Sequence, residues 1–355
     1  MKHSTYYIHN VEPLDISSIK VEIRNSSIGK VMDMIKNKDI VLPISEDRYS
    51  WDSKKKSQFL ESVILGLPIP SLFFYIDEKS GKLLIIDGVQ RLRSLYDYIV
   101  GKNVCLNDLQ LINEDKFNKH FDELPYSVRL DIKMHSISLN VISGINSAEA
   151  KYTIFKRYCS KSNHLSPAEI RYNLFPGNAN NIIERMCNED IFKMLVSSKI
   201  HNIRRKCEEF ASRFIALYLA DGIIINKDED IEMLSVSTYE ILNNEFDTND
   251  TLQLLEIFEN SLSTCYKILG ENAFAIPGKN KVSINVFEIL TIPIARLSKF
   301  EQDLFLERKE IFKSKYFTLF KKREFASLLS NKSTYNNIKN GIDIINNLIR
   351  DILGK

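Results

Sequence analysis

A short polar run directly after a predicted strand is the best candidate for chemistry in this sequence. The run is Asp87-Gly88-Val89-Gln90-Arg91, and it opens a predicted helix. A glycine in such a turn lets a ligand approach the backbone, and the N–H groups at a helix start favour an anion. Arg91 could bind phosphate oxygens, Asp87 could hold magnesium, a ribose hydroxyl or water, and Gln90 could orient that water. The run predicts a phosphate site; an ordinary Asp-Gly turn with a solvated arginine is the alternative.

Three residues upstream of this run are further candidates for nucleotide binding. Arg48 and Trp51 lie in a predicted loop, and Trp51 is the only tryptophan of the chain. Its ring could contact a ligand, or it could simply fill core volume. Glu61, on the polar side of the next predicted helix, could be a general base or a metal ligand. The alternative for Glu61 is a solvated helix carboxylate.

The best candidate for nucleic-acid contact is the segment 308–323, in which basic and aromatic residues are interleaved. Lysine and arginine bind phosphates, and aromatic rings stack on bases. We expect the contacts at Lys315, Lys321, Lys322 and Arg323. At helical spacing, however, the aromatic side chains could instead face the core and leave the lysines as a solvated face.

The elements that must position these residues form a mixed pattern followed by a helical one. Apolar spacing predicts helices at 26–37 and about 53–65, with Gly66 as the stop, and strands at 72–76 and 83–86. The second strand is continuously apolar, so we expect it to be buried on both faces. A helix from Val89 to about Gly101, a strand around 137–141 and a helix at 147–158 follow.

Beyond residue 160, helical periods dominate, at 209–220, 251–269, 286–297 and 336–353. Ser166-Pro167-Ala168-Glu169 has the composition of a capping box with proline at the first helical position. We therefore predict an α+β protein, with a mixed α/β domain over residues 1–150 and a mainly α-helical domain over 151–355.

Composition narrows the class of protein. Lysine and arginine number 48 against 46 aspartate and glutamate, so any contact with nucleic acid must come from a local patch. The five cysteines are widely spaced and form no C-x-x-C pair, which favours neither a disulfide framework nor a zinc ribbon. No signal peptide or membrane span is recognisable, so we expect a cytoplasmic protein without membrane contact.

Several motifs in order resemble those of one known family. Residues 57–70 read SQFLESVILGLPIP and residues 86–92 read IDGVQRL, and further matches lie at 154–157, 165–171, 208–217 and 242–243. These resemble the "IES-ill-g-PiP" and "DGQQRL" motifs of the GmrSD-type N-terminal domain, of the ParB/sulfiredoxin superfamily. Val89 replaces the first glutamine of DGQQR, and EDRYSW at 46–51 departs from the family's "QR-x-Y-x-W". A site that lacks one cation would lose hydrolysis sooner than binding.

The resemblance implies a function as well as a fold. It implies a ParB-like mixed α/β core with a helical extension, in a bacterial protein that acts against foreign DNA. Asp87, Gly88, Gln90 and Arg91 inherit candidate roles in binding a nucleoside triphosphate with Mg²⁺, and any enzymatic activity would be NTP hydrolysis. The six scattered histidines form no HNH run, so we expect no HNH nuclease activity; either a partner protein would supply the nuclease or the response would stop at sensing. The rival hypothesis is a non-catalytic module that binds DNA or a partner protein and keeps the ParB-like scaffold.

Overall fold

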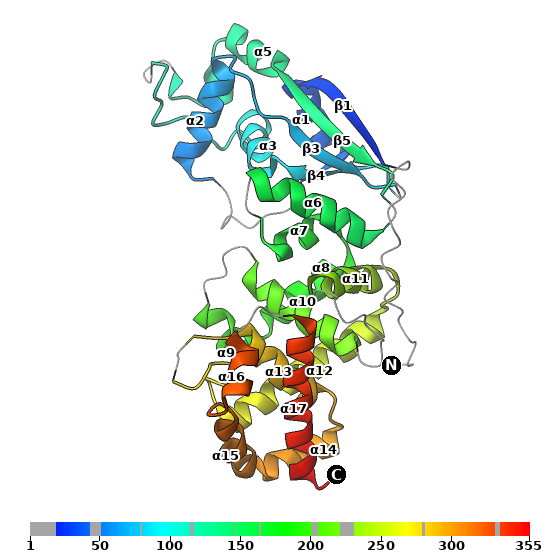
Figure 1. The fold of residues 1–355 in the computed structure, drawn as a ribbon. Coiled ribbons are helices and arrows are strands. Elements are labelled where there is room, and N and C mark those ends of the chain that lie inside the picture. Colours follow the sequence, from blue (N-terminus) through cyan, green and yellow to red (C-terminus); the bar gives the residue numbers. More distant parts are fainter. Residues whose placement is uncertain are drawn as a thin grey trace. The chain divides into compact units, whose positions relative to one another are not determined.

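The chain contains two compact units, one within residues 12–165 and the other comprising 166–355. A computed structural model describes residues 19–42, 51–78, 80–113, 117–145, 147–162, 165–200, 205–220, 231–278, 281–330 and 334–355. The first unit is mixed α/β and the second is helical (Figure 1). The predicted α+β class is therefore confirmed.

The first unit is built on a five-stranded mixed sheet with strand order β1-β5-β3-β4-β2. β3 is antiparallel to β4 and parallel to β5, β1 is antiparallel to β5, and β2 is parallel to β4. The strands are β1 (Lys20–Ser27), β2 (Ile40–Val41), β3 (Leu72–Ile76), β4 (Leu83–Asp87) and β5 (Ser136–Ser143). The strands at 72–76, 83–86 and 137–141 were predicted, whereas β1 and β2 were not.

Helices cover both faces of this sheet (Figure 1). On one face, apolar side chains of α1 (Ile28–Lys36), α2 (Ser53–Ile64) and α3 (Val89–Tyr96) form a core with Leu72, Phe74 and Ile85. On the other face lies α6 (Ala148–Ser162), whose Phe155 meets Tyr75 edge-on at 6.1 Å between ring centroids. Both faces of β4 are buried, as its apolar run predicts. Helix α5 (Tyr126–Met134) packs against α1 and α2.

The helix boundaries agree with the sequence signals. Ser27 caps α1, and its hydroxyl accepts a hydrogen bond from the Lys30 backbone N–H at 3.3 Å. Gly66, with φ +72°, follows the last turn of α2. The helix that begins at Val89 is α-helical to Tyr96 and continues as a π-helical turn over Asp97–Gly101.

The second unit consists of helices packed around the apolar α13 (Ile284–Ala295). The predicted capping box is confirmed, because Ser166 and Glu169 exchange hydrogen bonds of 3.2 and 2.7 Å at the start of α7. None of the helices in the described ranges is long and apolar enough to cross a membrane. The other helices are α7 (Pro167–Leu174), α8 (Asn178–Asn188), α9 (Asp190–Leu195), α10 (Lys206–Leu219), α11 (Ile231–Asn244), α12 (Thr248–Leu269), α14 (Lys299–Glu307), α15 (Lys309–Leu319), α16 (Arg323–Ser330) and α17 (Tyr335–Leu353).

Candidate functional site

The turn between β4 and α3 requires a glycine for two independent reasons. Gly88 has φ +98°, a left-handed conformation that other residues rarely adopt. A Cβ atom at this position would lie 2.2 Å from Leu72 Cδ2, so the buried Leu72 side chain would have to shift to make room. No side chain among the described residues caps α3, so its N-terminal end keeps the electrostatic character that favours an anion.

Asp87 and Arg91 form an ion pair beside this turn. Arg91 Nη2 lies 2.9 Å from Asp87 Oδ2, and Asp87 is 8% exposed. Arg91 Nη1 also donates to the carbonyl oxygens of Pro70 and, at 3.4 Å, Ser71. Burial lowers the pKa of Arg91, and the Asp87 carboxylate opposes that shift. Arg91 is therefore not a solvated arginine, and it ties the turn to the segment that precedes β3.

Gln90 and Trp51 are brought together, as two candidates for one site should be. The backbone N–H of Trp51 donates to Gln90 Oε1 at 3.1 Å. The Trp51 ring meets Phe59 of α2 edge-on at 5.5 Å, and Lys55 Nζ lies 5.3 Å from the ring centroid. Trp51 thus joins the start of α2 to the start of α3. Arg48 lies outside the described residues.

Glu61 is buried rather than solvated. It is 2% exposed, and its Oε1 accepts hydrogen bonds from the backbone N–H groups of Gln110, Leu111 and Ile112 at 2.8, 2.6 and 3.0 Å. The prediction of a solvated carboxylate on the polar side of α2 is wrong, because the loop around residue 111 covers that side. The observed contacts hold this loop, and a role of Glu61 in nucleotide binding stays a prediction.

The geometry of the turn limits how it could bind a metal ion. In the parts of the chain that the structure describes, no three His, Cys, Asp or Glu side chains are grouped so that they could hold one. Mg²⁺ is commonly held by one or two carboxylates together with phosphate oxygens and water. Asp87 fits that mode, with the end of α3 beside it for the phosphates.

The basic segment near the C-terminus lies in the second unit, on α15 and the start of α16. Phe312 and Tyr316 are buried, so these two rings face the core and do not stack on bases. Phe317 is 47% exposed. The predicted contact residues are all exposed, namely Lys315, Lys321, Lys322 and Arg323. The basic side chains keep their candidate role, whereas stacking by Phe312 and Tyr316 is excluded by their burial.

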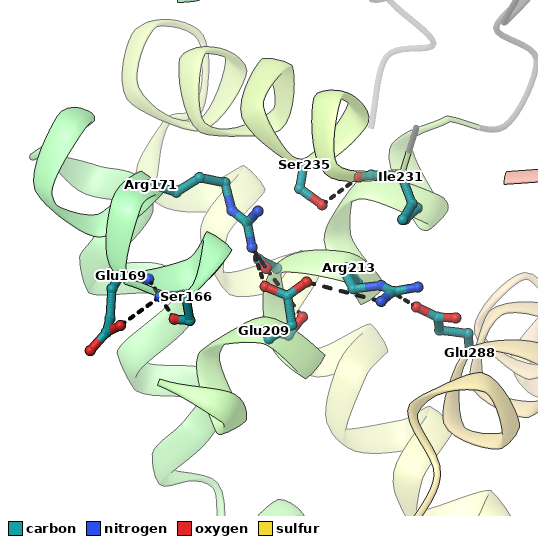
Figure 2. Close-up of polar contacts among 9 residues, drawn as sticks. Ser166, Glu169, Arg171, Glu209, Arg213, Ile231, Ser235 and Glu288 are labelled. Atoms are coloured by element: carbon teal, nitrogen blue, oxygen red, sulfur yellow. Dashed lines mark hydrogen bonds and ion pairs between the residues drawn. The ribbon is translucent and has the colours of Figure 1, made fainter. Parts of the chain in front are cut away.

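A buried chain of charges in the second unit was not predicted (Figure 2). Arg171 of α7 is ion-paired with Glu209 of α10, and Arg213 Nη1 lies 4.0 Å from Glu209 Oε1. Arg213 Nε is 2.5 Å from Oε1 of Glu288 on α13, although the N–H is not aimed at the carboxylate, so this contact is an ion pair rather than a hydrogen bond. Alternating charges therefore link α7, α10 and α13.

Glu288 lies at the end of this network of charges, on α13. It is fully buried, and the rest of α13 is almost entirely apolar. Burial raises the pKa of Glu288 to about 7, with the positive charge of Arg213 acting in the opposite direction. Two sequence features could have identified this network. One is a single glutamate in an apolar helix, and the other is the pair of Glu209 and Arg213 at helical spacing.

Comparison with known proteins bears on the first unit and the start of the second. Neither the curated proteins nor the solved structures contain a match to this chain. A protein-family model does match, over a range that includes β2 to β5, the Asp87 to Arg91 turn and helix α7. The resemblance found in the motifs is thereby confirmed, and it suggests a link to restriction. Residues 28–176 match the GmrSD restriction endonuclease N-terminal domain.

Proposed function

We propose that the chain acts in restriction of foreign DNA and that its first unit binds a nucleoside triphosphate with Mg²⁺ at the turn from Asp87 to Arg91. The observation that carries this proposal is the ion pair of Asp87 and Arg91 beside the uncapped start of α3. The match to a domain of restriction proteins supplies the biological setting.

The parts of this turn suit a triphosphate in different ways. Gly88 is left-handed and buried, with the side chains of Leu72 and Arg91 beside it. Phosphate oxygens would therefore meet the backbone N–H groups in the first turn of α3. Arg91 is already oriented by Pro70 and Ser71, so little side-chain entropy is lost when it contacts a phosphate. Mg²⁺ carried by the nucleotide would exchange one water ligand for the Asp87 carboxylate.

Binding is proposed ahead of hydrolysis because of Gln90. A glutamine that orients an attacking water uses its carbonyl oxygen as the acceptor, and in this chain that oxygen accepts from the Trp51 backbone. Val89 occupies the neighbouring position and carries no polar group. NTP turnover would therefore require Gln90 to give up this contact.

The test is a thermal-shift panel of the full chain with each common nucleoside triphosphate and Mg²⁺. A ligand at a hundred times its Kd stabilises the folded state by about 2.7 kcal/mol, which raises Tm by several degrees. Asp87→Asn should lose the magnesium-dependent part of this shift, because the amide keeps the shape but not the charge. The control is Asp77→Asn, in the loop after β3. Equal shifts in Asp87→Asn and the unmodified protein would contradict the proposed site.

The rival function is a non-catalytic module that binds DNA, and one observation favours it. Arg91 and Gln90 are both engaged in contacts within the first unit, whereas Lys321, Lys322 and Arg323 are exposed together. If this segment binds DNA, affinity should fall steeply with salt and weaken when the three residues are neutralised. Neutralising the exposed lysines Lys36, Lys54 and Lys299 provides the matched control. Salt-independent binding would exclude the electrostatic mechanism.

A further inference from the structure

The outer edge of β1 is the longest unpaired sheet edge among the described residues. β1 is the first strand in the order β1-β5-β3-β4-β2, and its eight residues pair with β5 on one side only. The strand at the opposite edge, β2, has two residues. Native proteins commonly blunt or cover a long edge, because its free N–H and C=O groups pair readily with another strand.

Apolar side chains on β1 are exposed next to this edge. Val21 is 59% exposed and Ile23 is 69% exposed, although both belong to a strand of the central sheet. Their partners in β5 are Ile142, which is buried, and Asn140. Exposed apolar residues on an unpaired strand edge are the features that a strand-pairing interface requires.

The charges of β1 select one way for the strand to pair with a second copy of itself. In an antiparallel pair with two-fold symmetry, the central residue lies opposite its own copy. A residue before the centre then lies opposite the residue equally far after the centre in the other copy. With Ile23 at the centre, Glu22 of each copy lies opposite Arg24 of the other. With Glu22 or Arg24 at the centre, identical charges would oppose each other, which is unfavourable. A centre at Val21 would leave most of β1 unpaired.

We propose that the protein forms a two-fold homodimer through antiparallel pairing of β1 with β1, centred on Ile23. The two five-stranded sheets then become one continuous sheet. The pairing covers Ile23 with its own counterpart and forms two Glu22–Arg24 contacts between copies, in place of the single contact of 2.7 Å that these residues make within each strand.

A hollow lies at the end of β1. This hollow of about 310 Å³ is lined by Asn25, Ser26 and Ser27 of β1 together with Lys30, Ser136 and Met134, of which Met134 is 67% exposed. Pairing centred on Ile23 places Ile19 of the second copy opposite Ser27. An apolar side chain is thereby brought to a hollow whose rim includes an exposed methionine, so the dimer buries apolar surface beyond the strand itself.

The test is sedimentation equilibrium of the full chain from about 1 to about 100 µM, a range that covers weak dimers. We expect a concentration-dependent dimer that Ile23→Lys weakens at least about tenfold, because two lysines would then oppose each other. Ile311→Lys, at a residue of α15 that is 53% exposed, is the matched control and should dimerise normally. Circular dichroism of each variant checks that it is folded.

A charge exchange separates pairing at this edge from any other mode of association. Glu22→Arg places an arginine opposite Arg24 of the other copy at both contacts and should weaken the dimer. The double variant Glu22→Arg, Arg24→Glu restores opposite charges and should restore the dimer. A monomer at all concentrations would overturn the proposal. So would a dimer that is unchanged by Ile23→Lys, or one that the double variant fails to recover.

Discussion

The buried carboxylate of Glu288 should make the stability of the second unit depend on pH in a direction that one substitution can isolate. Its pKa is about 7 in the folded protein, against an ordinary value of 4.5. A carboxyl group with a raised folded pKa contributes stability that is fully present below 4.5 and is lost as pH rises through about 7. Glu288→Gln keeps the shape and cannot ionise, so the variant should not show this loss.

The size of the effect follows from the two pKa values. A difference of one pKa unit corresponds to about 1.4 kcal/mol, so full ionisation of Glu288 costs the folded state about 3 kcal/mol. Between about pH 5 and about pH 8, the stability of Glu288→Gln relative to the unmodified protein should increase by about 2 to 3 kcal/mol. For a unit of this size, that increase corresponds to a difference in Tm of about 5 to 10 °C.

The assay is thermal unfolding followed by far-ultraviolet circular dichroism at both pH values. Trp51, the only tryptophan, lies in the first unit, so its fluorescence separately reports unfolding there. Glu256→Gln, at an exposed position of α12, is the matched control and should change little with pH. Parallel pH profiles for Glu288→Gln and the unmodified protein would refute the reasoning, since Glu288 would then ionise equally in folded and unfolded states.

Three further substitutions test contacts that the structure assigns to individual residues. Glu61→Ala removes the acceptor of three backbone N–H groups and should destabilise the first unit by about 3 kcal/mol. The measurement is denaturant unfolding followed by Trp51 fluorescence. A loss of stability below about 1 kcal/mol would mean that water replaces the carboxylate. Gly88→Ala forces a Cβ against Leu72 and should lower stability by more than about 2 kcal/mol in the same assay, whether or not a nucleotide is present; an unchanged midpoint would mean that the turn relaxes. Asn243→Ala deletes the side chain that accepts from the Ala179 N–H at 2.8 Å, so it should lower the free energy of unfolding by about 1 to 2 kcal/mol. The measurement is thermal unfolding followed by circular dichroism, and an unaffected Tm would show that another group caps α8.

The elements of the fold with strong periodicity were predictable, and the elements at the edges were not. The apolar run of β4 predicts burial on both faces because only a central strand can bury consecutive side chains. β1 also alternates apolar and polar residues, but only Val21 and Ile23 are apolar and both side chains are exposed. Nothing in such a segment distinguishes an edge strand from a loop until its pairing with β5 is known.

The candidate site was predictable where its residues are neighbours in sequence and unpredictable where they are not. The proximity of Asp87 and Arg91 follows from helical spacing, whereas the contact of Arg91 with Pro70 depends on how the segment before β3 returns past α3. Glu61 was assigned to the polar side of α2, which is correct for the isolated helix. Its burial arises from the loop that reaches it from residues 110–112, some fifty positions later.

The residues that carry the family resemblance thus bind other parts of the first unit, and this fact decides which variants are informative. Arg91 holds the segment before β3, Gln90 holds the backbone at Trp51, and Glu61 holds a distant loop. Loss of activity in an alanine variant of any of them would not separate a chemical role from a structural one. Asp87→Asn is more informative because an amide oxygen can still accept from Arg91, so the fold keeps its contact while the charge that would bind Mg²⁺ is lost. A magnesium-dependent nucleotide effect that survives Asp87→Asn would contradict the proposed site, and it would leave Asp87 as the partner of Arg91 only.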